Sequence, residues 1–270
     1  MKRAAVLLCA TALLAACAST PRAPVAPSAA IGELAPNGKL RAAINFGNPV
    51  LAQKDAATGE PRGVSVDLAR ELARRLGVPL DMVLYTAAGK VTDDARANEW
   101  DIAFVAIDPA RAVDMDYSAA YVIIEGAYLV PRDSPIRDNA AVDRDDVRVV
   151  AGRGSAYDLY LTRELKHAQI VRSPTSGVVV DMMLAQRLDV AAGVRQQLEA
   201  DAKRVANVRV LDGRFMVISQ AMATPKGRPA GARYLIAFVE EMKSSGFVAQ
   251  GLRRSGVEGA GVAPPQRATP

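Results

Sequence analysis

The 270-residue sequence contains little of what metal sites and thiol or imidazole catalysis require, with one histidine and two cysteines. A single histidine cannot form a multi-histidine metal site, and imidazole catalysis would depend on His167 alone. His167 lies in a polar stretch, and we assign it no role. Cys9 and Cys17 both fall in the first seventeen residues, so the rest of the chain offers no thiol nucleophile and no cysteine ligand. We therefore expect no bound metal and no cofactor.

The sequence also lacks a strong charge of one sign and is poor in aromatic residues, with 34 Lys+Arg against 29 Asp+Glu and 5% aromatics. Lys2 and Arg3 supply two of the five net positive charges, so the charge falls to +3 once the first residues are removed. Because no basic stripe with interleaved aromatics is present, we expect no nucleic-acid partner. The 50% hydrophobic and 23% charged content is that of an ordinary globular protein, in one large domain or two small ones.

The apolar run at 4–16 is shorter than the roughly 20 residues that cross a bilayer. Preceded by Lys2 and Arg3, it has the pattern of an export signal. Its last residues, Leu-Ala-Ala before Cys17, resemble the bacterial lipobox, whose cysteine becomes the lipidated first residue. We therefore expect a lipoprotein signal peptide at 1–16 and a lipid anchor on Cys17 as the only membrane contact, in the periplasm or cell envelope. An ordinary secretory signal is the alternative, and inner or outer membrane anchoring stays open.

The two ends of the chain differ in composition from the middle. Residues 17–36 contain four prolines among Ala, Ser and Thr, a composition that predicts an extended tether without a helix. Residues 258–270 are rich in Gly and Pro, and we expect a disordered tail there. The folded body is therefore predicted to lie between these two segments.

Strand and helix patterns alternate along this body. Leu68, Leu72 and Leu76 recur at helical spacing before Gly77, a natural helix stop. The predicted elements are strands at 39–46, 80–85 and 101–107, then strands at 147–151, 170–171 and 189–193 with helices at 157–165 and 178–186, and a long helix from 228. This alternation predicts an α/β protein with two α/β units.

One short motif, Asp108-Pro109-Ala110-Arg111, directly follows the third predicted strand. Asp favours the N-cap and Pro the first position of a helix, so the motif predicts a turn of helix with Arg111 as its third residue. A guanidinium matches a carboxylate with two parallel hydrogen bonds, and the first turn of a helix attracts anions. Arg111 is therefore a candidate anion-binding residue, and a surface pair with Asp108 or Asp114 is the alternative.

Five segments, in this order along the chain, resemble the family 3 solute-binding proteins of bacterial uptake systems. They are GEPRGVSVDLARELARRLGVPLDMV, WDIAFVAIDPARAVDMDYSAAY, VRVVAGRGSAY, LAQRLDVAAG and SSGFVAQGLRRSGV. The resemblance covers roughly residues 38–257. It implies the two-lobed periplasmic binding protein type 2 fold, in which two α/β lobes are joined by two crossover strands and close on a ligand by a hinge motion. We expect the first lobe at 37–121 and 222–257 and the second lobe at 122–221.

The resemblance also implies roles for residues of the first lobe. In the family, the arginine of the motif binds the ligand's α-carboxylate, which implies that role for Arg111. Asp108 stands where the family usually has Thr or Ser, and Ala106 where it often has a hydroxyl. We expect Asp108 to cap the turn or to supply a counter-charge for a ligand ammonium, and Ala106 to line the cleft. Phe46 is a candidate apolar wall or a core residue, and Lys90 a candidate for a second ligand anion or a solvated side chain.

On the second lobe, Ser155 and Ala156 are expected to present N–H groups and one hydroxyl to the ligand, with a plain strand-to-helix turn as the alternative. In the family an Asp near the position of Val194 takes the ligand's α-amino group. Because Val194 carries no charge, the resemblance does not identify the ligand as an ordinary L-α-amino acid. Asp189 is expected to support its strand rather than to contact the ligand.

The implied function is that of a monomeric solute-binding component of an ABC-type uptake system. It would capture a small carboxylate-bearing ligand, amino-acid-like molecules included, for an inner-membrane permease. No catalytic residue is evident, so we expect no enzyme. Two alternatives use the same fold, namely a dehydratase-like enzyme with a carboxylate or Lys90 as general acid, and a ligand-sensing lobe.

Overall fold

The computed structural model describes residues 26–256 and 258–266. The predicted signal peptide at 1–16 and the predicted anchor Cys17 lie outside the described residues. Within the described ranges, no helix combines the length and the apolarity that crossing a bilayer demands.

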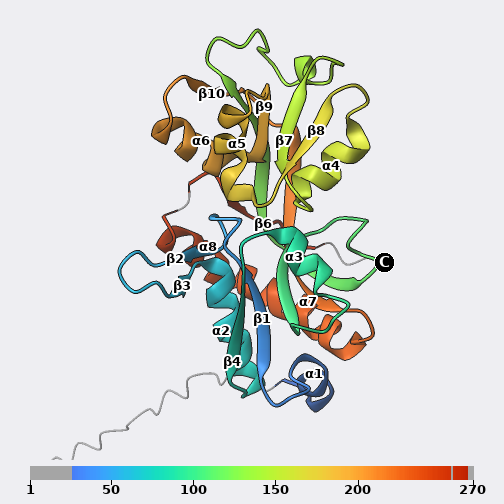
Figure 1. Cartoon of the computed structure of the whole chain (residues 1–270). Coiled ribbons are helices and arrows are strands. Elements are labelled where there is room, and N and C mark those ends of the chain that lie inside the picture. The colour runs from blue at the N-terminus through green and yellow to red at the C-terminus, as the bar shows by residue number, and fades with distance from the viewer. Residues whose placement is uncertain (1–25, 257, 267–270) are drawn as a thin grey trace, which may run out of the picture.

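Two α/β lobes are stacked along the long axis of the molecule (Figure 1). The first lobe, at the bottom of the view, contains α1 (Ser28–Leu34), β1 (Leu40–Asn45), β2 (Gln53–Lys54), β3 (Pro61–Arg62), α2 (Val64–Leu76), β4 (Leu80–Tyr85), α3 (Ala88–Asp93), β5 (Ile102–Ala106), α7 (Pro229–Ser244) and α8 (Phe247–Arg254). The second lobe contains η1 (Ala140–Val142), β7 (Arg148–Gly152), α4 (Ala156–Glu164), β8 (Gln169–Ser173), η2 (Ser176–Val178), α5 (Val179–Ala185), β9 (Val190–Val194), α6 (Arg195–Arg204) and β10 (Val208–Val210).

Two long antiparallel strands, β6 (Met115–Pro131) and β11 (Met216–Pro225), run through both lobes and join them. The sheet order is β4-β1-β5-β11-β6-β9-β7-β8, with parallel pairs β1–β4, β1–β5, β7–β8 and β7–β9 on either side of the crossover strands. The β6–β11 register shifts between Gln220 and Ala223. The lobe boundaries proposed from the sequence, 121/122 and 221/222, fall in these two strands beside that irregularity.

Helix α2 illustrates how the sequence pattern produces the first lobe. Leu68, Leu72 and Leu76 are buried on one face of the helix, and Gly77 ends it in the left-handed conformation with φ 68°. Strand β5 is buried along its whole length, as expected for a parallel strand covered on both faces. This packing holds the carboxyl ends of β1 and β5 toward the second lobe.

The structure corrects the tether predicted at 17–36 only for its described part, residues 26–36, because Ser28–Leu34 forms helix α1 on α7. Pro27 stands at the N-cap of this helix, where a proline interrupts no helical hydrogen bond. Leu34 is fully buried against Gly231, whose backbone N–H donates to the Glu33 carboxylate at 2.7 Å. The burial of Leu34 therefore decides the structure where local composition predicted an extended chain.

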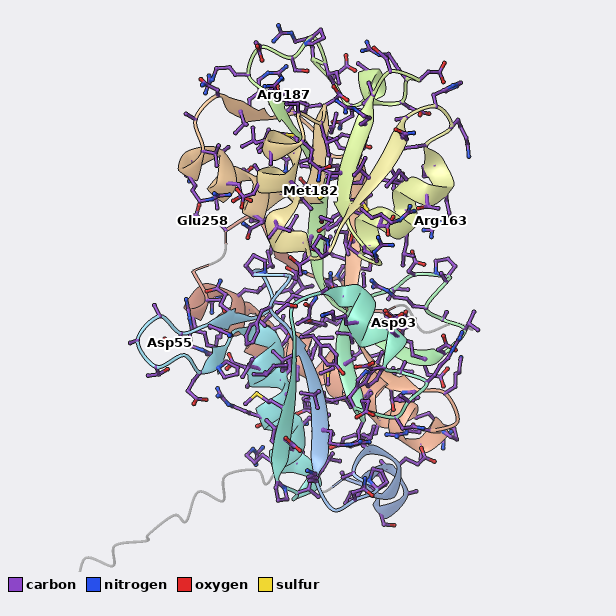
Figure 2. The ribbon with its side chains drawn as sticks, viewed as in Figure 1. Asp55, Asp93, Arg163, Met182, Arg187 and Glu258 are labelled. Carbon is purple, nitrogen blue, oxygen red and sulfur yellow. The ribbon has the colours of Figure 1, made fainter. Side chains whose placement is uncertain are left out.

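The prediction of a disordered tail at 258–270 is also wrong for the described part of that segment. Strand β12 (Gly261–Val262) pairs antiparallel with Ile123 and Val122 of β6. Ala263 is buried, and Lys243 Nζ donates to the backbone carbonyl of Pro264 at 2.9 Å. In the view of Figure 2, Glu258 at the start of this segment and Arg163 on the second lobe lie on opposite edges of the molecule. Because β12 pairs with β6, this segment returns the chain to the crossover strand.

Candidate functional site

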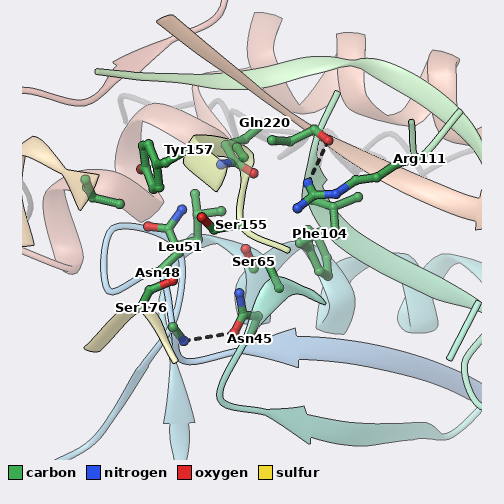
Figure 3. Close-up of a pocket in the computed structure, with 16 residues that line it drawn as sticks. Asn45, Asn48, Leu51, Ser65, Phe104, Arg111, Ser155, Tyr157, Ser176 and Gln220 are labelled. Atoms are coloured by element: carbon green, nitrogen blue, oxygen red, sulfur yellow. Dashed lines mark hydrogen bonds between the residues drawn. The ribbon is translucent and has the colours of Figure 1, made fainter. Parts of the chain in front are cut away.

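A cavity lies between the two lobes (Figure 3). Both lobes contribute to the wall, which consists of Asn45, Gly47, Asn48, Leu51, Ser65, Ala88, Phe104, Val105, Ala106, Arg111, Ser155, Ala156, Tyr157, Ser176, Val194 and Gln220. Asn45, Ala106 and Val194 are the last residues of β1, β5 and β9. The cavity therefore lies at the carboxyl ends of parallel strands, where α/β sheets bind ligands.

Arg111 enters this cavity from the connection between β5 and β6. This connection contains the single turn expected from the sequence, too short to be a helix of its own. The backbone N–H of Ala112 donates to the carbonyl of Asp108, four residues earlier as in an α-helix, and the N–H of Arg111 donates to the same carbonyl. The Arg111 side chain is 1% exposed. Its Nη1 donates to the carbonyl of Ala106 at 3.1 Å, and its Nη2 to the carbonyl of Gly154 on the second lobe at 2.8 Å. The guanidinium thus contacts both lobes.

The charge of Arg111 is not neutralised by the protein groups that surround it. Nε is buried without a hydrogen-bond partner, and among the described residues no carboxylate forms an ion pair with this guanidinium. Burial lowers the pKa of Arg111, although the guanidinium stays protonated at neutral pH. A buried, unpaired charge is costly, and a carboxylate that accepts two parallel hydrogen bonds relieves that cost. The arrangement therefore suits a small anion.

Asp108 faces away from the cavity and does not line it. Its Oδ1 accepts from the backbone N–H of Ala110 at 2.9 Å, which is the capping role expected from the sequence. Its Oδ2 accepts from Arg163 Nη2 of the second lobe at 2.9 Å. The alternative role, a counter-charge for a ligand ammonium, has no geometric support, because the carboxylate is directed to Arg163. Asp108 instead links the lobes.

The start of α4 forms the opposite wall of the cavity. Ser155 caps this helix, its hydroxyl oxygen accepting from the Asp158 N–H at 3.2 Å, and the Asp158 carboxylate in turn accepts from the Gly154 N–H at 2.8 Å. The N–H groups of Ala156 and Tyr157, in the first turn, have no helical acceptor. Because Ser155, Ala156 and Tyr157 all line the cavity, these two N–H groups are available to an anion held by Arg111.

Two other candidates from the sequence do not line the cavity. Phe46 is half-buried against the main core, with Lys54 Nζ 5.4 Å from its ring centroid. Lys90 is an exposed residue of α3, whose first residue, Ala88, does reach the wall. Arg111, Ala106, Ser155 and Ala156 are thus brought together, whereas Phe46, Lys90 and Asp108 are not.

Sequence reasoning missed most of the polar groups of the wall, among them Asn45, Asn48, Ser65 and Gln220. Asn45 had a detectable signal, because it lies next to the last residue of the strand predicted at 39–46. Ser65 lies at the start of α2, and Gln220, 4% exposed, comes from β11. No sequence pattern relates either residue to Arg111, so only the fold identifies these two residues as part of the wall.

The lining carries few groups able to transfer a proton. Among the described lining residues, Arg111 is the only charged one and Tyr157 the only other titratable one. Burial raises the pKa of Tyr157 well above its ordinary value. In the part of the chain that the structure describes, no three His, Cys, Asp or Glu residues are grouped as a metal site would require. The carboxylate or Lys90 that a dehydratase-like mechanism would use is therefore not on this wall.

Solved structures with the same fold are numerous. The solute receptor for L-cysteine of Neisseria gonorrhoeae is 22% identical, with a TM-score of 0.73 over 83% of this chain and 92% of that one. A binding component of an ABC transporter from Wolinella succinogenes, complexed with lysine, is 22% identical, with a TM-score of 0.69 over 81% and 95%. An ancestral amino-acid-binding protein, described as a precursor of cyclohexadienyl dehydratase, is 23% identical, with a TM-score of 0.69 over 83% and 98%. These likenesses confirm the two-lobed fold.

The sequence comparisons give the family. No curated protein matches the sequence significantly. The family model for bacterial extracellular solute-binding proteins, family 3, matches residues 40–254, which include both lobes and both crossover strands. This protein therefore belongs to family 3 of the bacterial extracellular solute-binding proteins.

Proposed function

We propose that this protein is the solute-binding component of an ABC-type uptake system and captures a small carboxylate-bearing molecule between its lobes. The observation that carries the proposal is Arg111, a buried guanidinium on the cavity wall without an ion-pair partner among the described residues. Family membership supports solute capture, and three of the neighbouring structures are described as bound to lysine or arginine.

Capture by this site would couple ligand binding to lobe closure. Arg111 comes from the first lobe and the N–H groups of Ala156 and Tyr157 from the second. A carboxylate that accepts hydrogen bonds from both sides is bound most tightly when the lobes are together. It therefore shifts the population toward the closed state by its difference in affinity for the closed and open states. The β6–β11 register shift at Gln220–Ala223 is the expected position of the hinge.

Binding without turnover is the activity that this wall supports, because the described lining has neither a carboxylate nor a lysine to act as general acid. A test is incubation with a prephenate-like acid followed by mass spectrometry. Saturable binding with unchanged acid is the expected result, and conversion of the acid would contradict it.

The further assignments, to an envelope location with a lipid on Cys17, an inner-membrane permease as partner and a monomeric state, belong to this proposal. Labelling with a palmitate analogue tests the anchor, since the label should enter the wild-type chain and be absent from the Cys17→Ser variant. Equal labelling of the two chains would contradict it.

The site itself is tested by titration calorimetry with a panel of small carboxylic acids against Arg111→Gln. Glutamine keeps polar atoms but removes the charge. We expect the acids that bind wild type to bind the variant at least about 100-fold more weakly, which corresponds to about 2.8 kcal/mol of binding free energy. A loss of this size is expected when one partner of a buried charge pair is removed. Arg96→Gln is the matched control, because Arg96 is a first-lobe arginine with 73% side-chain exposure, paired with Asp114. Equal affinity of wild type and Arg111→Gln would refute the site.

A further inference from the structure

The cavity wall carries hydrogen-bond donors whose orientation the structure fixes. Asn45 Oδ1 accepts from the Gly47 N–H at 2.9 Å (Figure 3), and Asn48 Oδ1 accepts from the Val50 N–H at 3.2 Å. Because a backbone N–H requires an acceptor, these contacts fix the orientation of both amides. Each asparagine is therefore left with an amide NH₂, a donor, for a ligand in the cavity.

Further groups around Arg111 are also hydrogen-bond donors. Arg111 has only donors, and its Nε is buried without a partner. The open N–H groups of Ala156 and Tyr157 are donors as well. The Ser155 oxygen already accepts from Asp158, so its hydroxyl is free to donate. These groups therefore offer N–H and O–H donors to a ligand from both lobes.

The acidic residues closest in sequence to this wall are engaged elsewhere. Asp158, on α4, accepts from the Gly154 N–H and pairs with Arg172 at 2.9 Å. Asp108 pairs with Arg163 at 2.9 Å. Among the described lining residues none is acidic, and Val194, 4% exposed, occupies the end of β9 with an apolar side chain. The wall therefore offers one positive charge and no negative one.

On the premise of the proposed function, we propose that the ligand is a small carboxylic acid without a protonated amine, of the 2-oxo or 2-hydroxy acid class. A carboxylate with a neighbouring carbonyl or hydroxyl oxygen accepts from Arg111, the α4 N–H groups and the asparagine amides. An ammonium group has three donors and no acceptor. In this cavity it would be desolvated, close to the Arg111 charge and without a counter-ion, which is the costly case of charge burial.

The test uses sets of three acids that share a side chain and differ only in a 2-oxo, 2-hydroxy or 2-amino group. The side chains should range from methyl to the largest that the cavity admits. Titration calorimetry on the full wild-type chain at pH 7 should show that the tightest 2-oxo or 2-hydroxy acid binds at least about 100-fold more tightly than its 2-amino counterpart. That ratio corresponds to about 2.8 kcal/mol.

A second variant tests the effect of a negative charge on the cavity wall. Val194→Asp adds a carboxylate to the wall at the N-cap of α6, a position where Asp is favourable for the helix. In this variant, the ratio of 2-oxo acid affinity to 2-amino acid affinity should be at least about tenfold smaller than in wild type. Val194→Asn has the same shape without the charge and should keep the wild-type preference. If Val194→Asp does not fold by circular dichroism, the wild-type comparison decides alone.

The outcomes separate this inference from the function on which it rests. A wild-type chain that binds 2-amino acids as tightly as their 2-oxo counterparts, with affinity that still depends on Arg111, overturns the inference and leaves solute capture intact. A wild-type chain that binds none of the acids overturns both. A Val194→Asp variant that folds and keeps the full 2-oxo preference also counts against the inference.

Discussion

The ion pair between Asp108 and Arg163 should favour the closed arrangement of the lobes. The Asp108 side chain is 6% exposed and the Arg163 side chain 42% exposed, with 2.9 Å between Oδ2 and Nη2. Arg163→Gln would leave the Asp108 carboxylate nearly buried in the closed state, with the Ala110 N–H as its remaining donor. In the open state the same carboxylate can be hydrated, so the substitution should penalise closure specifically.

The size of the effect follows from this exposure. Removing one partner of a fully buried charge pair costs about 2–5 kcal/mol, whereas exposed pairs contribute about 0–1 kcal/mol. With one buried and one partly exposed partner, we expect about 1–2 kcal/mol, a factor of roughly 5–30 in the ratio of closed to open molecules. The apparent Kd for ligand should rise by a similar factor, because binding must then drive a less favourable closure.

Spin-label distance measurements can follow closure directly. Asp93→Cys on the first lobe and Gln186→Cys on the second are exposed positions, and Cys9 and Cys17 would be replaced by serine. The double variant Asp108→Asn with Arg163→Gln should recover part of the loss, because it buries no unpaired charge and Asn still caps the turn. If Arg163→Gln changes neither the distance distribution nor the Kd, the cross-lobe pair does not control closure.

Two further predictions concern positions outside the cavity wall. Gly154→Ala places a Cβ 2.7 Å from Gly89 Cα across the lobes, at a residue with φ +65°. The ligand Kd should therefore rise about tenfold, and the free energy of unfolding in urea should fall by about 1 kcal/mol. Gly177→Ala, with open space around it, is the control and should leave the Kd unchanged. Arg75 donates to Glu241 at 2.6 and 2.7 Å and lowers the pKa of that carboxyl from its usual 4.5. Arg75→Gln should therefore cost about 1 kcal/mol of thermal stability at neutral pH, and this difference from wild type should shrink as the pH falls from 4.5 through the folded pKa; a difference that stays constant over that range would contradict the pairing.

The parts of the fold that were predictable from the sequence are those with local signals. Helix α2 has its leucine spacing and a terminal Gly77, and the apolar runs of β5 and β9 are typical of buried parallel strands. Helix α1 and strand β12 have no such signal. Each is stabilised by residues more than a hundred positions away in the chain, Gly231 for α1 and Val122 for β12, and composition carries no information about such contacts.

The residues of the candidate site likewise fall into those with a local sequence signal and those without one. Arg111 was identifiable because its turn chemistry and its position after a strand are local features. Gln220 and Ser65 enter the cavity from β11 and α2, and only the crossover topology brings them to Arg111. The orientation of Asp108 was also beyond the sequence, since its partner Arg163 belongs to the other lobe.

The central claim is that the cavity holds a carboxylate on Arg111. Its most direct test is mass spectrometry of small molecules released by denaturation from wild-type protein and from the Arg111→Gln variant, both purified from the same bacterial host. The account predicts a small carboxylic acid released in near-stoichiometric amount from wild type and strongly depleted from the variant. Release of the same molecules in equal amounts from both, or of a wild-type ligand without an acid group, would contradict it.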